Sequence, residues 1–169
     1  LGARTALVEH HKVGGECLHS GCVPSKALVH AARVYHEMTH ADRLGLPRVV
    51  MPAEFSRVME HVSRVVEEIY KHENPDVFRR MGIDVYEAAA AFESPESVRV
   101  GDEVFGFGCT LLCTGSSPLV PPIAGLADVP YLTNENVWAI RELPPSILFI
   151  GAGPISVELG QALARFGSS

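Results

Sequence analysis

Two cysteines five positions apart, Cys17 and Cys22, are the residues of this sequence best suited to chemistry. Gly21 between them permits a sharp turn, and Pro24 is typical of the first turn of a helix. Cys22 would then lie at the amino end of that helix, where unpaired N–H groups and the helix dipole favour a thiolate. Lys26, one helical turn later, would add a positive charge on the same face. A stabilised thiolate beside a partner thiol is what a reversible redox disulfide requires.

Two other interpretations of this pair stay open from the residues alone. Two nearby cysteines can form a merely structural disulfide, or can be unrelated thiols. Cys17, His19 and Cys22 could also bind zinc together with His10 or His11, which would make the chain a zinc-stabilised interaction module. A closed zinc site needs a second tight pair of ligands, and none is apparent, so we predict no metal ligands.

A second cysteine pair, Cys109 and Cys113, is predicted to be inert. The two residues begin and end an apolar run that is typical of a fully buried strand. On such a strand both thiols would point to the same side and behave as small core hydrophobes.

Gly151 and Gly153 form the second candidate site, between an apolar strand at Ile147–Ile150 and a helix. Glycines in a strand–turn–helix context are the dinucleotide fingerprint, because they let a pyrophosphate approach the helix amino terminus closely. Ser156 replaces the usual last Gly or Ala of the pattern. An ordinary βα turn fits the spacing equally well, and Glu158 in the following helix could simply be a surface acid that complements the helix dipole.

The elements that must position these residues alternate between helical and strand periodicity. The helical pattern is clearest from Phe55 to Ile69, where the apolar residues form one stripe. We also expect helices from Cys22 to about Arg43, from Asn74 to Gly82 and from Val157 to Phe166. We expect strands at Ala6–Val8, Ile83–Tyr86, Ala90–Phe92, Val98–Phe105 (around a Gly101-Asp102 turn), Cys109–Cys113 and Ile147–Ile150. Six prolines between Pro118 and Pro145 mark a connector, so we predict domains at residues 1–145 and 146–169.

The composition excludes several classes of function. The chain has 169 residues, 47% of them hydrophobic and 20% charged, which is ordinary for a soluble globular protein. The net charge of −6, without a run of Lys or Arg, argues against a nucleic-acid partner. The longest apolar stretch is too short to span a bilayer, so no membrane partner is expected. Four cysteines are too few for a disulfide scaffold, which favours a reducing, cytoplasmic location.

The stretch from Gly14 to Leu28 (GGECLHSGCVPSKAL) resembles a long, specific motif of the FAD-dependent pyridine nucleotide–disulfide oxidoreductases. This family includes dihydrolipoamide dehydrogenase, glutathione reductase and mercuric reductase. Thr114-Gly115-Ser116 with Pro118 is similar to its second flavin-binding stretch, and Ile150 to Gly160 is similar to the start of its NAD(P) domain. The order and spacing of these stretches agree across essentially the whole chain.

The resemblance implies an α/β fold. It would comprise a partial Rossmann-like FAD-binding domain (three-layer β/β/α) that lacks its first strand, followed by the opening βα unit of a second Rossmann-like domain for NAD(P). The implied enzyme passes electrons from NAD(P)H through FAD to a Cys17–Cys22 disulfide, and on to a small disulfide or another thiol-reactive acceptor such as a metal ion.

The resemblance also implies a role for each matching residue. Cys17 would exchange with the substrate, and Cys22 would be the thiol nearest the flavin. Lys26 would lie near the flavin and pair with Glu158. The remaining FAD contacts would come from Glu9, which would hold the ribose, and from Gly14, Gly15, Thr114 and Gly115, while Gly151 and Gly153 would line the NAD(P) pyrophosphate.

Three departures from the family pattern shape a further expectation. Glu16 stands where the family often has Thr. The family's first glycine fingerprint would precede Leu1, and its dimer domain would follow Ser169. We therefore expect an internal fragment of a longer, homodimeric enzyme. An alternative is that the 169 residues alone are catalytically silent and bind no cofactor.

Overall fold

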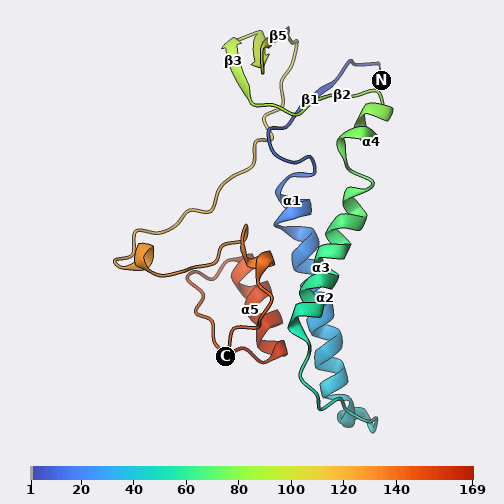
Figure 1. Cartoon of the computed structure of the whole chain (residues 1–169), viewed down its shortest axis with the longest axis vertical. Helices are drawn as coiled ribbons and strands as arrows, with labels where there is room; N and C mark the ends of the chain where they lie inside the picture. The colour runs from blue at the N-terminus through green and yellow to red at the C-terminus, as the bar shows by residue number, and fades with distance from the viewer. Residues whose placement is uncertain (1) are drawn as a thin grey trace. The chain divides into compact units, whose positions relative to one another are not determined.

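The structure, a computed structural model, describes residues 2–169 and divides into two compact units. Unit 1 comprises residues 2–15 and Ile69–Ser116, and unit 2 comprises Glu16–Glu68 and Ser117–Ser169. The units are described separately below, and Figure 1 gives the path of the chain. Among the described residues, no helix is long and apolar enough to cross a membrane.

Unit 2 is built on helices. Helix α1 (Gly15–His19) leads into α2 (Cys22–Thr39), and α3 (Phe55–Tyr70) and α5 (Pro154–Phe166) complete the set. Three short 3-10 helices join them: η1 (Ala41–Leu44), η2 (Leu126–Asp128) and η3 (Val137–Ala139). Helices α2 and α5 pack against each other along their length (Figure 1).

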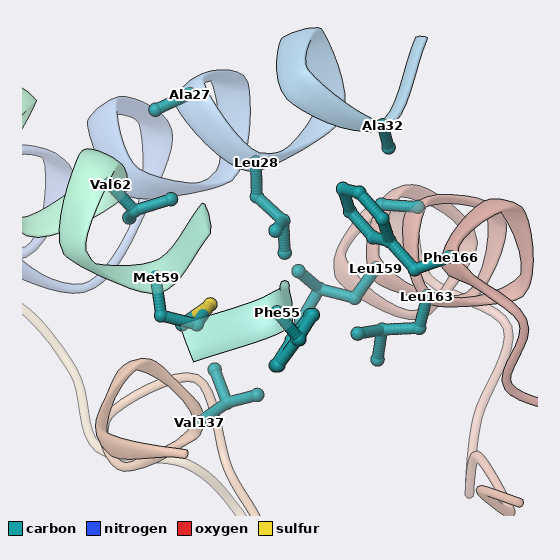
Figure 2. Close-up of a cluster of buried hydrophobic side chains, with 11 residues drawn as sticks. Ala27, Leu28, Ala32, Phe55, Met59, Val62, Val137, Leu159, Leu163 and Phe166 are labelled. Carbon is teal, nitrogen blue, oxygen red and sulfur yellow. The ribbon is translucent and has the colours of Figure 1, made fainter. Parts of the chain in front are cut away.

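The core of unit 2 lies between α2, α3, α5 and η3, and Figure 2 shows its side chains converging. Each helix contributes apolar residues at helical spacing, which places them on one face. Leu28 of α2, Met59 of α3 and Leu163 of α5 are each 1% exposed. The predicted stripe of the Phe55 helix is confirmed, since it supplies Phe55, Met59 and Val62 to this core.

Helix α2 ends earlier than the expected Arg43. The α-helical hydrogen bonds stop at Thr39, and the 3-10 turn η1 follows. The Thr39 hydroxyl donates to the carbonyls of Tyr35 and His36, both at 3.0 Å. A side chain that bonds back to the preceding turn competes with helix continuation, which explains the early end.

Unit 1 holds two small sheets and one short helix. Strand β1 (Ala6–Val8) pairs in parallel with β2 (Asp84–Tyr86), and Leu7 lies opposite Val85. Strands β3 (Ala90–Ser94), β4 (Ser97–Val100) and β5 (Glu103–Gly106) form an antiparallel meander. Helix α4 (Pro75–Arg80) is capped by Asn74, whose side chain accepts a hydrogen bond from the Val77 N–H. The strands and the capped helix predicted for this region are confirmed.

The prediction of a buried strand at Cys109–Cys113 is wrong. The segment has no regular secondary structure, and Cys109 and Cys113 are both exposed. Leu111 and Leu112 between them are 85% and 71% exposed. A strand forms only where a neighbour satisfies its backbone groups, and none of the described strands pairs with this run.

The predicted strand at Ile147–Ile150 is also absent, although its alternating pattern survives. Ile147 and Phe149 pack against the unit 2 core, whereas Leu148 is 89% exposed and Ile150 is 53% exposed. The Ile147 N–H donates to the Ser169 carbonyl at 2.9 Å. Within residues 2–169 no series of such bonds pairs this segment with a strand. Every second side chain is therefore buried, as in a strand, although no sheet forms here.

Candidate functional site

The two candidate redox cysteines lie on consecutive helices that meet at a tight backbone turn. Cys17 lies within α1, and Cys22 is the first residue of α2. The short helix α1 therefore directly precedes the turn at Gly21. A Cβ at Gly21 would lie 3.0 Å from the Glu16 carbonyl oxygen and 3.3 Å from the Cys17 Cα. Glycine therefore lets the backbone preceding Cys22 pack closely against the backbone of Cys17.

Cys22 lies at the uncapped amino end of a long helix. Cys22 occupies the first turn of the 18-residue helix α2, and its N-cap residue, Gly21, offers no side-chain cap. No acidic residue lies in that turn to satisfy the helix dipole. Cys17 and Cys22 are both exposed, so an acceptor in solution can reach their sulfur atoms.

Lys26 and Glu158 form an ion pair between α2 and α5, as the family resemblance implied. The Lys26 Nζ donates to Glu158 Oε1 at 2.6 Å and to Oε2 at 2.8 Å, so both carboxylate oxygens are engaged. Leu28 and Leu159, close in sequence to the two charged residues, belong to the buried core that α2 and α5 share. The packing of the two helices thus brings together residues that are 132 positions apart.

Lys26 and Glu158 each shift the pKa of the other. The hydrogen bond to Glu158 raises the pKa of Lys26 above its ordinary value of 10.5, against partial desolvation. Negative charge on Cys22 and on Cys17 raises the Lys26 pKa further. The hydrogen bond from Lys26 lowers the pKa of Glu158 below 4.5, also against desolvation, and a hydrogen bond from Ser25 adds to that lowering. The ammonium group therefore lies within electrostatic reach of both sulfurs.

Trp138 is a site residue that the sequence analysis missed. Its indole N–H is shared between the Ser20 carbonyl at 3.0 Å and the Asn134 carbonyl at 2.7 Å. Ser20 lies between the two cysteines, 118 positions from Trp138. The only signal in the sequence is that Trp138 is the single tryptophan of the chain, and this does not indicate its partner.

Unit 1 holds several of the residues expected to bind FAD. Glu9 follows β1, is half-buried, and accepts a hydrogen bond from the His11 N–H through Oε1 at 2.9 Å. Gly14 and Gly15 adopt left-handed φ values of 110° and 63° just before the cysteine segment. Thr114 lies in exposed chain without regular structure, next to Gly115. The Glu9 carboxylate retains acceptor positions that fit a ribose hydroxyl.

The glycine turn before α5 fits an anion. Gly151 has φ +108°, a conformation that other residues rarely adopt, whereas Gly153 is extended and caps α5 without a side-chain bond. No acid lies in the first turn of α5, so its amino terminus remains open to a phosphate charge. Glu158 lies one residue beyond that turn. Its carboxylate bonds Lys26, so it is not simply a surface acid that complements the helix dipole.

Close packing behind this turn comes from a residue that the sequence analysis did not assign to it. A Cβ on Gly160 would lie 3.4 Å from the Phe149 ring. The helix therefore contacts the preceding segment at Gly160. Its place in α5, facing an aromatic residue before the turn, is the signal that could have indicated it.

The alternative of a zinc site finds no support in the geometry. Over residues 2–169, no three His, Cys, Asp or Glu side chains are grouped so that they could hold a metal ion. The rings of His10 and His11 contact each other at a tilt of 41°, with ring centroids 3.8 Å apart.

Comparisons with known proteins agree with this geometry. The sequence profile described as "Pyridine nucleotide-disulphide oxidoreductase" matches residues 1–169. A mercuric reductase of Staphylococcus aureus is 30% identical over 167 residues, covering 99% of this chain and 30% of the relative. A dihydrolipoyl dehydrogenase of Bacillus subtilis (strain 168) is 33% identical over 172 residues, covering 99% of this chain and 36% of the relative.

A solved structure shows the same fold. The HOCl-induced flavoprotein disulfide reductase RclA from Escherichia coli superposes with a TM-score of 0.77 at 28% identity, covering 99% of this chain and 35% of that one. Our chain thus spans about a third of the length of the proteins it matches. The mixed α/β architecture matches part of the Rossmann-like FAD-binding domain of disulfide oxidoreductases. The chain belongs to the pyridine nucleotide–disulfide oxidoreductase family.

Proposed function

We propose that this protein is a flavin-dependent disulfide oxidoreductase. In this proposal NAD(P)H supplies the electrons that reduce a Cys17–Cys22 disulfide, and the resulting dithiol reduces a small disulfide or another thiol-reactive acceptor. The observation that carries the proposal is the juxtaposition on α1 and α2 of two exposed cysteines within electrostatic reach of the Lys26–Glu158 pair.

The proposed cycle balances in electrons and protons. NAD(P)H gives up a hydride, which carries two electrons, and FAD supplies the two-electron relay when bound. The Cys17–Cys22 S–S bond breaks, and with one proton from solvent the two sulfurs become thiols. The Cys17 thiolate then attacks one sulfur of the acceptor disulfide, which forms a mixed disulfide and releases the first product thiol. Attack by Cys22 on the Cys17 sulfur releases the second product thiol and restores the S–S bond.

Lys26 would hold the charge that this exchange needs. Negative charge on Cys22 and on Cys17 raises the Lys26 pKa, so the ammonium group keeps its positive charge beside the two cysteines. Glu158 engages Nζ with both carboxylate oxygens and fixes its position. We therefore assign Lys26 and Glu158 to the catalytic set together with Cys17 and Cys22.

We propose cofactor contacts for individual residues. For FAD we propose Glu9, Gly14, Gly15, Lys26, Thr114 and Gly115. For the NAD(P) pyrophosphate we propose Gly151 and Gly153, because the amino terminus of α5 has no side-chain cap and no acid in its first turn. We also propose that residues 1–145 belong to the FAD-binding domain and residues 146–169 to the start of the NAD(P) domain.

A thiophilic metal ion is a second acceptor class that the comparisons favour. Two of the relatives named above bear on it: one is a mercuric reductase, and RclA has also been solved as a Cu(II) complex. Soft metal ions prefer thiolate ligands, and both cysteines are exposed here. We further propose a cytoplasmic homodimer. The location rests on the reducing environment that a catalytic dithiol suits, and the dimer rests on family resemblance.

The test is spectroscopic. The full-length protein should purify with a flavin spectrum, and NADH or NADPH should produce a long-wavelength band from thiolate–flavin contact. The band should be lost in Cys22→Ser and kept in Cys109→Ser, a matched control at another exposed cysteine. Absence of bound flavin, or an undiminished band in Cys22→Ser, would contradict the proposal. Steady-state rates with a disulfide and with Hg²⁺ then separate the two acceptor classes.

A further inference from the structure

The hydrogen bond from Trp138 to Ser20 ties a distant segment to the turn between the two cysteines. The Ser20 N–H is already used within this turn, donating to the Glu16 carbonyl at 2.9 Å. The Ser20 carbonyl accepts from the Trp138 indole at 3.0 Å. Both backbone groups of the residue two positions before Cys22 are therefore fixed.

The segment that presents Trp138 is itself held firmly. Val137 is buried in the unit 2 core beside Met59, as Figure 2 shows. The Trp138 carbonyl accepts a hydrogen bond from the Arg141 guanidinium at 3.0 Å, and the indole N–H also bonds Asn134 at 2.7 Å. Trp138 is thus a donor on a core-anchored segment, and its indole N–H bonds the cysteine turn.

The geometry of the cysteine turn matters because a disulfide tolerates little variation. The two Cα atoms must lie about 4.4–6.8 Å apart, with a restricted torsion about the S–S bond. A turn that is held near this geometry in the dithiol state loses less freedom when the bond forms, so the disulfide is favoured. A turn without the hydrogen bond from Trp138 would form the same disulfide at a greater entropic cost.

We propose that Trp138 is a positioning residue for the Cys17–Cys22 pair: its indole N–H braces the turn through Ser20 and thereby lowers the reduction potential of the disulfide. This inference rests on the proposed dithiol function. A single hydrogen bond changes an equilibrium by about three- to tenfold. For a two-electron couple a tenfold change corresponds to about 30 mV, so loss of the N–H should raise the potential by about 15–30 mV.

The experiment uses Trp138→Phe in the full-length protein, which keeps an aromatic ring in the core and removes the N–H. The matched control is Tyr35→Phe. Tyr35 also packs on the unit 2 core and donates one bond to a backbone carbonyl, that of Met51 at 3.1 Å. The protein is equilibrated in dithiothreitol redox buffers and alkylated. Mass spectrometry of the peptide that contains Cys17 and Cys22 then gives the potential.

We expect a potential about 15–30 mV less negative in Trp138→Phe and unchanged in Tyr35→Phe. An unchanged potential in Trp138→Phe, or equal shifts in both variants, would overturn the inference while leaving the proposed function intact. A wild-type pair that does not titrate as a disulfide would overturn both. Should Trp138→Phe fail to fold, benzothienylalanine at position 138 replaces the N–H by sulfur in nearly the same shape, and the same shift is expected.

Discussion

The Lys26 ammonium and the Glu158 carboxylate meet at 2.6 Å although both side chains keep contact with solvent. Exposed ion pairs contribute little to stability, because water screens them and their side chains lose freedom. In the proposed function, this pair places a positive charge near the two cysteines. Its contribution to stability should still be visible as a pH dependence.

The sign of that dependence follows from the two pKa shifts. Glu158 has a lowered pKa, so its stabilisation is present above 4.5 and is lost as the pH falls through the folded-state value. Lys26 has a raised pKa, so its stabilisation is present below 10.5 and is lost as the pH rises through the folded-state value. Glu158→Gln should therefore lower the melting temperature at pH 7 and reduce the loss of stability below pH 4.5.

Melting temperature measured against pH checks this prediction. Glu142→Gln, at an exposed glutamate of the same unit, serves as the control and should reproduce the wild-type curve. A Glu158→Gln curve parallel to wild type from pH 7 down to acid would show that the pair does not hold in solution.

Gly21 offers a second test at the level of single residues. An added methyl group would lie 3.0 Å from the Glu16 carbonyl oxygen, and that atom belongs to the backbone and cannot swing away. Gly21→Ala should therefore destabilise the protein by about 1–3 kcal/mol, the usual cost of overpacking. It should also slow disulfide formation between Cys17 and Cys22.

Urea unfolding and the rate of air oxidation, followed by loss of thiol titre, measure both effects. Gly108→Ala is the matched control, because a Cβ at Gly108 meets nothing within 4 Å. Equal stability of the two alanine variants would mean that the turn is looser than the structure shows.

At the scale of elements, the packing of α2 on α5 sets the distance between Lys26 and Glu158. Leu163 of α5 is 1% exposed, so Leu163→Ala would leave a cavity and should cost about 2–5 kcal/mol. Leu148→Ala provides the comparison. That side chain is 89% exposed, and its removal should change stability by no more than about 0.5 kcal/mol. Chemical denaturation of the two variants checks the difference, and comparable losses would contradict the assigned core.

The elements differ in how far their sequence determines them. The apolar residues from Phe55 to Ile69 repeat with the period of a helix, so the local pattern sufficed to predict α3. The runs at Cys109–Cys113 and Ile147–Ile150 are also apolar. A strand, however, needs a neighbouring strand to bond its backbone N–H and C=O groups. That requirement is non-local, and the described strands do not meet it for either run.

The site residues also differ in whether local sequence or a distant contact determines them. The cysteine spacing, Gly21 and the amino end of α2 are local features and could be predicted from the sequence. The Lys26–Glu158 pair was available only through family resemblance, because 132 positions separate its members. The bond from Trp138 to Ser20 was not predictable, since it depends on how η3 packs beside α3 in the core.

At the scale of the whole molecule, this chain covers about a third of each relative, yet it holds the cysteine pair and the Lys26–Glu158 pair within unit 2. The candidate FAD residues Glu9, Thr114 and Gly115 belong to unit 1. The central claim of the proposed function is that electrons from NAD(P)H reach the bond between Cys17 and Cys22.

Alkylation mapping of the full-length protein tests that claim most directly. The oxidised protein is labelled with iodoacetamide before and after addition of NADPH or NADH under argon, and each cysteine is quantified by mass spectrometry. We predict that labelling of Cys17 and Cys22 rises together on reduction, whereas labelling of Cys109 and Cys113 stays constant. Labelling of Cys17 and Cys22 that is the same with and without reduced nicotinamide would contradict it.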